Sequence, residues 1–234
     1  MSASSVPPGT TAQHALAGLR RAIVARELRP GQRIVQEEVA ERLGVSIGPV
    51  REALRVLEQE GQVTYKPRRG YFVTEMRAED LEEIYALREV LETRAARRAL
   101  PTLGDDALER IAGAAADCVN AAEAGDVAAE LEANRRFHFG LLESPDQFHT
   151  MRVIRLLWDS TEAYRALYYN SPDERREAAD AHDRILAAVQ RGEADELVAE
   201  LDAHRARALD VLKVILAPPA NPKDAAGGHT QRGV

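Results

Sequence analysis

The sequence has few of the features on which several protein classes depend. Of its 234 residues only one, Cys118, is a cysteine, which excludes an intramolecular disulfide framework and a cysteine-rich zinc finger. No apolar run approaches the roughly 18 residues of a membrane-spanning helix. Residues 1–10 lack the basic start and apolar stretch of a secretory leader, so we expect a cytoplasmic protein with no membrane partner. Aromatic residues make up only 5%, whereas alanine and leucine abound, which predicts an aliphatic, mostly helical core.

Charge is distributed unevenly along the chain. The net charge is −7, which alone argues against a nucleic-acid partner. Residues 1–77, however, hold 12 Lys and Arg against 8 Asp and Glu, a net charge of +4, while residues 78–234 hold 19 against 30, a net charge of −11. This asymmetry predicts an N-terminal part that binds a polyanion and a C-terminal part with a different task, although a chance fluctuation of charge would look the same.

Residues 12–76 are predicted to form a winged helix-turn-helix domain. Three helical patterns precede two β-prone runs around a Pro/Gly turn, at about 12–28, 36–43, 47–60, 63–65 and 71–73. Gly44 is well placed to end the second helix in a left-handed conformation. The short turn that follows sets the third helix at a steep angle, as a helix that enters the major groove of DNA requires.

Four arginines of this region are candidate DNA contacts. Arg51 and Arg55 are four residues apart on the third helix, on the side away from its apolar positions, where they can contact phosphates or a guanine edge. Arg68 and Arg69 lie at the tip of the predicted hairpin, within reach of a minor groove or its backbone. The alternative is that these arginines are solvated and the hairpin only covers a core.

The predicted fold class is mostly α: an N-terminal winged helix-turn-helix followed by an all-α helical bundle over residues 78–217. Breaks at Pro, Gly and Ser-Pro positions divide the bundle into six predicted helices, at about 78–100, 104–124, 126–143, 146–169, 172–191 and 193–216. The flanking segments 1–11 and 218–234 contain few apolar residues, and we expect both to be disordered tails.

Three histidines of the bundle occupy positions where they can meet. Asn134 and His138 are four residues apart and share one helix face, while His182 and His204 lie on antiparallel neighbours joined by a short turn. Three imidazoles and one amide oxygen suit Zn²⁺ or another divalent transition metal, such as Ni²⁺ or Mn²⁺. Spacing alone is weak support, because a histidine on a helix is commonly structural or exposed.

The winged region also contains a set of motifs at characteristic spacing, namely Pro30-Gly31, Gly44-Val45-Ser46, Pro49-Val50-Arg51-Glu52-Ala53-Leu54, Glu60-Gly61 and Arg69-Gly70-Tyr71-Phe72-Val73. Together they resemble the GntR family of bacterial transcription regulators, over residues 12–75. The resemblance implies that Ser46, Ile47, Gly48 and Gly70 join the four arginines at the DNA. The family usually has Arg-Thr at positions 47 and 48, and that arginine commonly reads a guanine. We therefore expect an operator that departs from the family's TGGT/ACCA-like half-sites, with Ile47 against a thymine methyl.

The bundle carries a second resemblance, through Leu131 to His138, Ala181 to Leu186 and Ala203-His204. These segments look like the FCD effector domain of the FadR-type branch of the family, over about residues 78–216, and six helices indicate its shorter VanR-like subgroup. The resemblance implies that position 134 and the three histidines bind a metal, which with nearby side chains holds a small carboxylate effector. Because this chain has Asn134 where the pattern usually has Asp, we expect weaker metal binding.

Arg88 is the candidate effector-binding residue of the bundle. It stands where the FCD pattern places an arginine that faces the pocket, and a buried guanidinium pairs bidentately with a carboxylate. A salt bridge to Glu92, four residues later on the same helix, is an equally good interpretation of this arginine.

These features predict a homodimeric, ligand-responsive transcription regulator that is not an enzyme. Two winged heads would bind a palindromic double-stranded operator, and a small organic acid would change their placement and so the DNA affinity. Repression relieved by ligand is the family's commoner mode. One alternative is a metal sensor without an organic effector. Another is a metal-dependent enzyme on the bundle, although the sequence has no HExxH motif and no paired Glu-x-x-His motifs.

Overall fold

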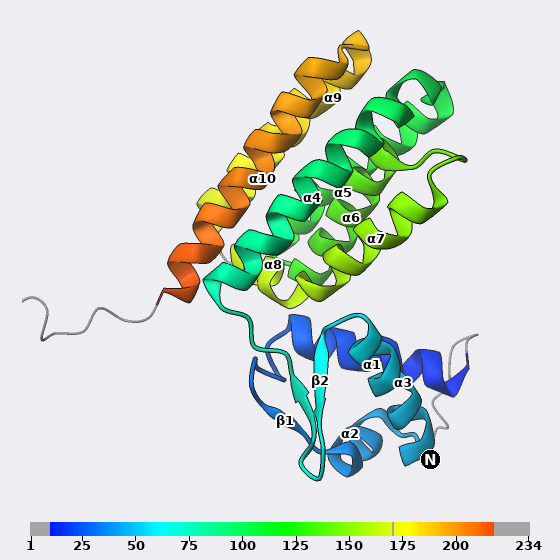
Figure 1. The fold of residues 1–234 in the computed structure, drawn as a ribbon, viewed down its shortest axis with the longest axis vertical. Coiled ribbons are helices and arrows are strands. Elements are labelled where there is room, and N and C mark those ends of the chain that lie inside the picture. Colours follow the sequence, from blue (N-terminus) through cyan, green and yellow to red (C-terminus); the bar gives the residue numbers. More distant parts are fainter. Residues whose placement is uncertain (1–9, 170, 218–234) are drawn as a thin grey trace, which may run out of the picture.

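The computed structural model describes residues 10–169 and 171–217 and shows a winged N-terminal part beneath a helical bundle (Figure 1). The predicted tails 1–11 and 218–234 lie outside the described residues, apart from Thr10 and Thr11. Those two residues open the first helix: the Thr10 hydroxyl accepts a hydrogen bond from the backbone N–H of Gln13, whose side chain in turn accepts one from the backbone N–H of Thr10. This reciprocal cap fixes the helix start.

Three helices and the hairpin β2-β3 form the winged part, as predicted, and the short strand β1 adds a third antiparallel strand to the hairpin. The helices pack around Leu19 and Ile23 of the first and Leu54 and Leu57 of the third, all buried. The sheet has the order β1-β3-β2, and Val63 pairs with Val73 in its register. The elements are α1 (Thr11–Val24), β1 (Arg33–Ile34), α2 (Gln36–Leu43), α3 (Ile47–Gln59), β2 (Val63–Lys66) and β3 (Gly70–Val73).

The chain turns between α2 and α3 at Gly44, which has the left-handed conformation expected of it, with φ of 65°. The first helix ends earlier than the sequence pattern indicates, at Val24 instead of near Leu28. Arg26 takes a positive φ of 60° there, and the backbone N–H of Leu28 donates to the carbonyl of Ala22. Leu28 continues the apolar pattern of the helix, but it lies in the turn after α1 and is buried there.

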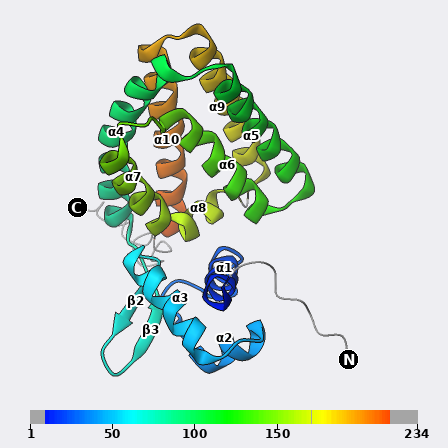
Figure 2. The ribbon, with the colours of Figure 1, turned by 90° about the vertical axis from the view of Figure 1, so that its right-hand side faces the viewer.

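The bundle consists of seven α-helices and one short 3₁₀ turn within the described residues. They are α4 (Ala78–Ala99), η1 (Leu100–Thr102), α5 (Asp105–Ala124), α6 (Val127–Leu142), α7 (Phe148–Ser160), α8 (Glu162–Tyr168), α9 (Pro172–Arg191) and α10 (Ala194–Leu216). Figure 2 shows these helices from the side, with α8 at the end of the bundle that faces α1. None of the helices in residues 10–169 and 171–217 combines the length and apolarity that crossing a membrane requires.

The prediction of one helix over residues 146–169 is wrong. The chain breaks at Thr161, whose φ of −101° and ψ of 1° interrupt the helix, and α8 continues beyond it as a separate element. The Thr161 hydroxyl is buried and lies within hydrogen-bond distance of the carbonyls of Leu157 and Trp158, so it satisfies acceptors at the end of α7. The VanR-like subgroup was inferred from a count of six helices, and that inference loses its basis.

The core of the bundle is mostly aliphatic, with Ile154 and Ile185 among its fully buried side chains, and it also contains the buried aromatic residues Phe137 and Trp158. Cys118 is buried on α5, as expected of a small core residue. A second apolar cluster at the α8 end contains Leu81, Tyr164 and Leu212, and it meets the winged part through Ala163.

Candidate functional site

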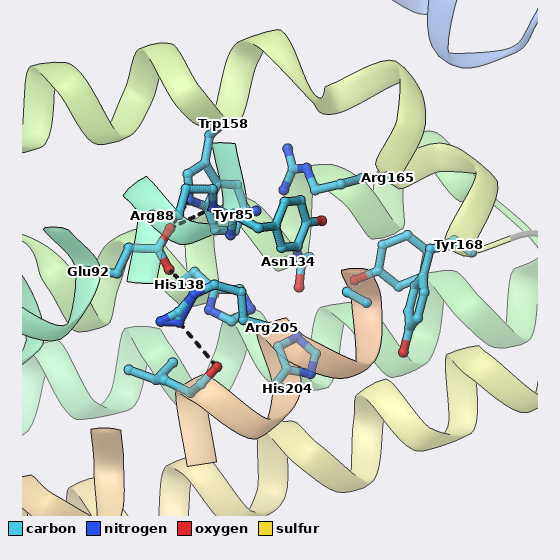
Figure 3. A pocket seen from close by; sticks show the side chains of 13 residues that line it. Tyr85, Arg88, Glu92, Asn134, His138, Trp158, Arg165, Tyr168, His204 and Arg205 are labelled. Atoms are coloured by element: carbon cyan, nitrogen blue, oxygen red, sulfur yellow. Dashed lines mark hydrogen bonds and ion pairs between the residues drawn. The ribbon is translucent and has the colours of Figure 1, made fainter. Parts of the chain in front are cut away.

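Three helices bring the predicted histidines together inside the bundle. His138 comes from α6, His182 from α9 and His204 from α10, and one ring nitrogen of each lies within 4.8 Å of the others. The ring centroids are 5.1 to 5.4 Å apart. His138 and His204 line a pocket that opens between α4, α6, α8 and α10 (Figure 3).

Burial keeps these imidazoles uncharged. It lowers the pKa of His138 and His182 well below the ordinary value, and the neighbouring histidines lower them further. Burial also lowers the pKa of His204 to about 4, and the nearby charges of Arg88 and Arg205 act in the same direction. Neutral imidazoles have free lone pairs, which is the state in which histidine binds a metal.

Several polar atoms around this cluster have no partner. Asn134, on the same face of α6 as His138, is only 4% exposed, and its Oδ1 makes no hydrogen bond within the described part of the chain. Both ring nitrogens of His182 are likewise unpaired there. Since buried polar atoms are normally satisfied, these orphans are what a site for an ion would leave. Three nitrogen ligands and one amide oxygen fit a divalent transition metal.

Arg88 lines the same pocket and is already paired. Its Nε donates to Glu92 Oε1 at 2.7 Å, the indole N–H of Trp158 donates to the same oxygen at 2.7 Å, and Arg205 Nε lies 3.7 Å from Glu92 Oε2. Although burial raises the pKa of Glu92, the two guanidinium groups outweigh it and hold the pKa below its usual value. Both interpretations of Arg88 from the sequence, pocket lining and ion pair with Glu92, therefore apply.

Sequence reasoning missed Arg165. It lies on α8, lines the pocket beside Tyr168, and its Cζ is 4.1 Å from the centroid of the Trp158 ring. The predicted helix 146–169 contained Arg165, Trp158 and Tyr168, but only the break at Thr161 turns all three toward one cavity. No signal in the sequence marks that break.

The predicted DNA contacts come from α3, from the residue before it and from the wing. Arg51, Arg55, Arg68 and Arg69 are all exposed, and so are Ser46 and Gly48. The Ser46 hydroxyl makes no capping hydrogen bond, although the residue occupies the N-cap position of α3. The Nε of Arg51 donates to Gln36 Oε1 at 3.1 Å.

Ile47 and Gly70 differ from the rest of this predicted set. Ile47 is half-buried and packs against the core of the winged part, so only part of its side chain can face a base. Gly70 has a φ of 90° and closes the wing hairpin opposite Lys66. Its role is to shape the tip that exposes the two wing arginines.

Helix α8 connects the pocket with the winged part. Tyr164 lies next to Arg165, and its hydroxyl accepts a hydrogen bond from the backbone N–H of Met76 at 2.6 Å and donates one to the carbonyl of Thr74 at 3.3 Å. Residues 74–77 link β3 of the wing to α4 of the bundle. One short helix thus holds a pocket residue and anchors the interdomain linker.

Comparison with protein families gives two matches along the chain. Residues 11–73 match the family described as bacterial regulatory proteins of the gntR family, and residues 83–207 match the FCD domain. The two matches correspond to the winged part and to the bundle that contains the pocket.

Several curated proteins are similar over most of the chain. The Nta operon transcriptional regulator of Aminobacter aminovorans is 30% identical over 195 residues, which cover 82% of this chain and 90% of that protein. The uncharacterized HTH-type transcriptional regulator YdhC of Bacillus subtilis is 26% identical, with coverage of 85% and 89%. The HTH-type transcriptional regulator McbR of Escherichia coli is 29% identical, with coverage of 70% and 75%.

Solved structures share the fold. Escherichia coli McbR/YncC superimposes with a TM-score of 0.78 at 24% identity, covering 89% of this chain and 100% of that one. A GntR-type regulator from Rhodococcus sp. RHA1 gives a TM-score of 0.73 at 24% identity, with coverage of 86% and 96%. At this identity the superpositions establish the arrangement of the two parts and no more.

Proposed function

Because the chain belongs to the GntR family of bacterial transcription regulators and carries an FCD domain, we propose that it is a homodimeric regulator whose DNA affinity is set by a small carboxylate bound beside a divalent metal. The observation that carries this proposal is the cluster of His138, His182 and His204 at an arginine-lined pocket, which α8 links to the DNA-binding part. Both matched families and the curated relatives are regulators, so an enzyme on the bundle is no longer an alternative.

The winged helix-turn-helix binds DNA, and we assign the contacts to α3 and the wing. Arg51 and Arg55 project from α3, and Arg68 and Arg69 from the hairpin tip, all exposed to solvent. Two such heads related by a two-fold axis suit a palindromic operator. A DNA partner agrees with the cytoplasmic location expected from the sequence, and that location stays a prediction.

The metal would be held by the three histidines and by Asn134. A bound divalent ion supplies a Lewis-acidic position for a carboxylate oxygen. The protein's own contribution is to keep the imidazoles neutral by burial and to surround the position with guanidinium groups. A metal sensor with no organic effector remains the second candidate, but the unsatisfied donors of the pocket favour an organic anion.

An exposed apolar face supports the dimer. Leu87 and Val90 of α4 and Val153 and Leu156 of α7 are between 41% and 69% exposed. Each pair is three residues apart and so shares one helix face, and α4 and α7 are neighbours in the bundle (Figure 1). Exposed apolar side chains on two neighbouring helices are typical of subunit contacts.

DNA binding at these positions is tested by substitution. A DNA fragment selected from a random pool is titrated with the protein, and Arg51→Ala should weaken binding about 10-fold and lower the salt dependence by about one counterion. Arg97→Ala, an exposed arginine on α4, is the matched control and should leave binding unchanged. Undiminished affinity of Arg51→Ala at moderate salt removes this residue from the interface, whereas failure to select any sequence contradicts the function itself.

A further inference from the structure

Arg165 is a buried cation with no hydrogen-bond or ion-pair partner in the part of the chain that the structure describes. Its side chain lies in a residue that is 6% exposed, and its Nε, Nη1 and Nη2 make no hydrogen bond to any residue that the structure describes. Leaving a guanidinium unpaired in the interior is costly, because it loses its hydration and gains no counter-charge. Proteins retain such a group where something else supplies the anion.

The protein's own carboxylates near the pocket are already engaged. Glu92 pairs with Arg88, and Asp202 pairs with Arg205 at 3.0 Å. Asp159, at the end of α7, pairs with Arg135 at 2.7 Å. Glu162 precedes Arg165 by three residues on α8, and its charge raises the pKa of Arg165 without forming an ion pair with it among the described residues. One positive charge of the pocket therefore has no ion-paired counterpart in the described chain.

Two of the groups without a hydrogen-bond partner enter the pocket from α8. Figure 3 shows Arg165 and Tyr168 at this pocket. The guanidinium groups of Arg165 and Arg88 both lie over the Trp158 ring, with Cζ 4.1 and 4.4 Å from its centroid. The buried Tyr168 hydroxyl also has no partner within the described residues. A guanidinium fork and a hydroxyl donor at one cavity are the groups that receive a carboxylate. Burial and the like charge of Arg88 lower the pKa of Arg165 to about 10, which agrees with a cation that lacks an anion.

We propose that Arg165, assisted by the Tyr168 hydroxyl, is the residue that binds the carboxylate of the effector, while Arg88 positions Glu92 and the Trp158 side chain. This proposal rests on the proposed function and identifies Arg165 as the group that recognises a small carboxylate. It differs from what the resemblance implies, since Arg88 has its charge satisfied by Glu92 and Arg165 does not. A ligand without a negative charge would leave Arg165 unpaired and would therefore bind with lower affinity than a carboxylate.

If Arg165 receives the effector carboxylate, replacing it should change the melting temperature in the opposite direction from replacing an arginine with a purely structural role. In the ligand-free protein the unpaired charge lowers stability, so Arg165→Met, which keeps an apolar stem against Trp158, should raise the melting temperature by a few degrees. A bound carboxylate stabilises the wild type by mass action and should not stabilise the variant. An arginine that only supports packing would lower the melting temperature when replaced.

The experiment titrates zinc-loaded protein with acetate, lactate, succinate and citrate by calorimetry, with acetamide as the uncharged comparison. Arg165→Met should weaken binding of the acid that the wild type prefers by at least 30-fold, and Arg165→Lys, which keeps the charge without the fork, by about 10-fold. Arg110→Met replaces an exposed arginine of α5 and should bind as the wild type does. DNA binding of Arg165→Met without acid should be retained, which shows that the variant is folded.

Two results of this acid titration would overturn the proposal, and they have different consequences for the proposed function. If the wild type binds an acid and both Arg165 variants bind it within twofold, Arg165 is not the carboxylate receptor, although the proposed function stands. If the wild type binds none of the four acids more tightly than acetamide, the effector class of the proposed function fails, and the assignment of Arg165 fails with it.

Discussion

Single residues of the pocket are held in states that folding alone does not favour. His204 is neutral, with a pKa lowered to about 4, and within residues 10–169 and 171–217 the Asn134 oxygen and the Arg165 guanidinium have no hydrogen-bond partner. Each carries a cost in the empty protein that a bound ion or anion would relieve. Residues that reduce stability in this way commonly serve binding, because stability and function compete at ligand sites.

Position 134 offers the sharpest residue-scale test of the metal site. Asn134→Asp replaces a neutral amide oxygen by a carboxylate, which should tighten Zn²⁺ binding by about 10-fold or more. The measurement is competition with a chromophoric chelator at pH 7.5. Asn120→Asp adds the same charge at an exposed position of α5 and should leave the affinity unchanged. Equal or weaker binding in Asn134→Asp would mean that this side chain does not ligate the metal.

The sequence indicated much of this site at the residue scale, and the limit of that inference is physical. Four-residue spacing placed Asn134 beside His138, and helix adjacency brought His182 to His204, because helix geometry is local and regular. Arg165 was not predicted as a pocket residue, because the direction of its side chain depends on the break at Thr161. At that break the Thr161 hydroxyl lies within hydrogen-bond distance of the carbonyls of Leu157 and Trp158, and the spacing of apolar residues does not report such a bond.

At the scale of elements, α8 stands between pocket and wing. Arg165 and Tyr168 line the pocket, while Tyr164 bonds to the linker at Thr74 and Met76. A small rotation of this seven-residue helix would move both contacts together. Helix shifts of this size are sufficient to switch the relative placement of domains.

Tyr164→Phe tests this coupling. The variant loses both hydrogen bonds to the linker at a stability cost of about 1 kcal/mol, and it should still bind DNA and acid with affinities within about twofold of the wild type. The effect of the acid on DNA affinity, measured by fluorescence anisotropy, should fall by at least threefold. A variant that responds to acid as strongly as the wild type would exclude the Tyr164 contact as a route of coupling.

The elements themselves were largely predictable. Gly44, Gly125 and Gly192 end their helices in the left-handed conformation, and glycines at helix ends are readable from sequence. The end of α1 was not predictable, because Leu28, which lies in the turn after the helix, continues its apolar pattern. Periodicity reports which side chains are buried and does not by itself separate a helix from a buried turn.

At the scale of the whole molecule, the basic winged part and the acidic bundle correspond to the two matched families. The bundle's exposed apolar face on α4 and α7 is the surface that we assign to the dimer. Two copies joined there would fix the spacing of the two DNA-binding heads, which a two-fold-related operator requires.

Val90→Arg tests the dimer. Val90 is 69% exposed, more than the other three residues of this apolar face, and a charge there should convert the dimer to a monomer at micromolar concentration. The mass is measured by light scattering after size-exclusion chromatography. Val119→Arg introduces the same charge at an exposed valine of α5 and should remain dimeric. An unchanged mass for Val90→Arg would place the interface elsewhere.

The most direct test of the account is the DNA affinity of the protein with and without its pocket ligands. Chelator-treated, zinc-loaded, and zinc- plus acid-loaded protein are titrated against the selected DNA fragment, with acetate, lactate, succinate and citrate as the acids. We predict that at least one acid changes the affinity by about 10-fold or more, and that His182→Ala combined with His204→Ala abolishes this change. DNA affinity that is the same in all states would contradict a regulator controlled through this pocket.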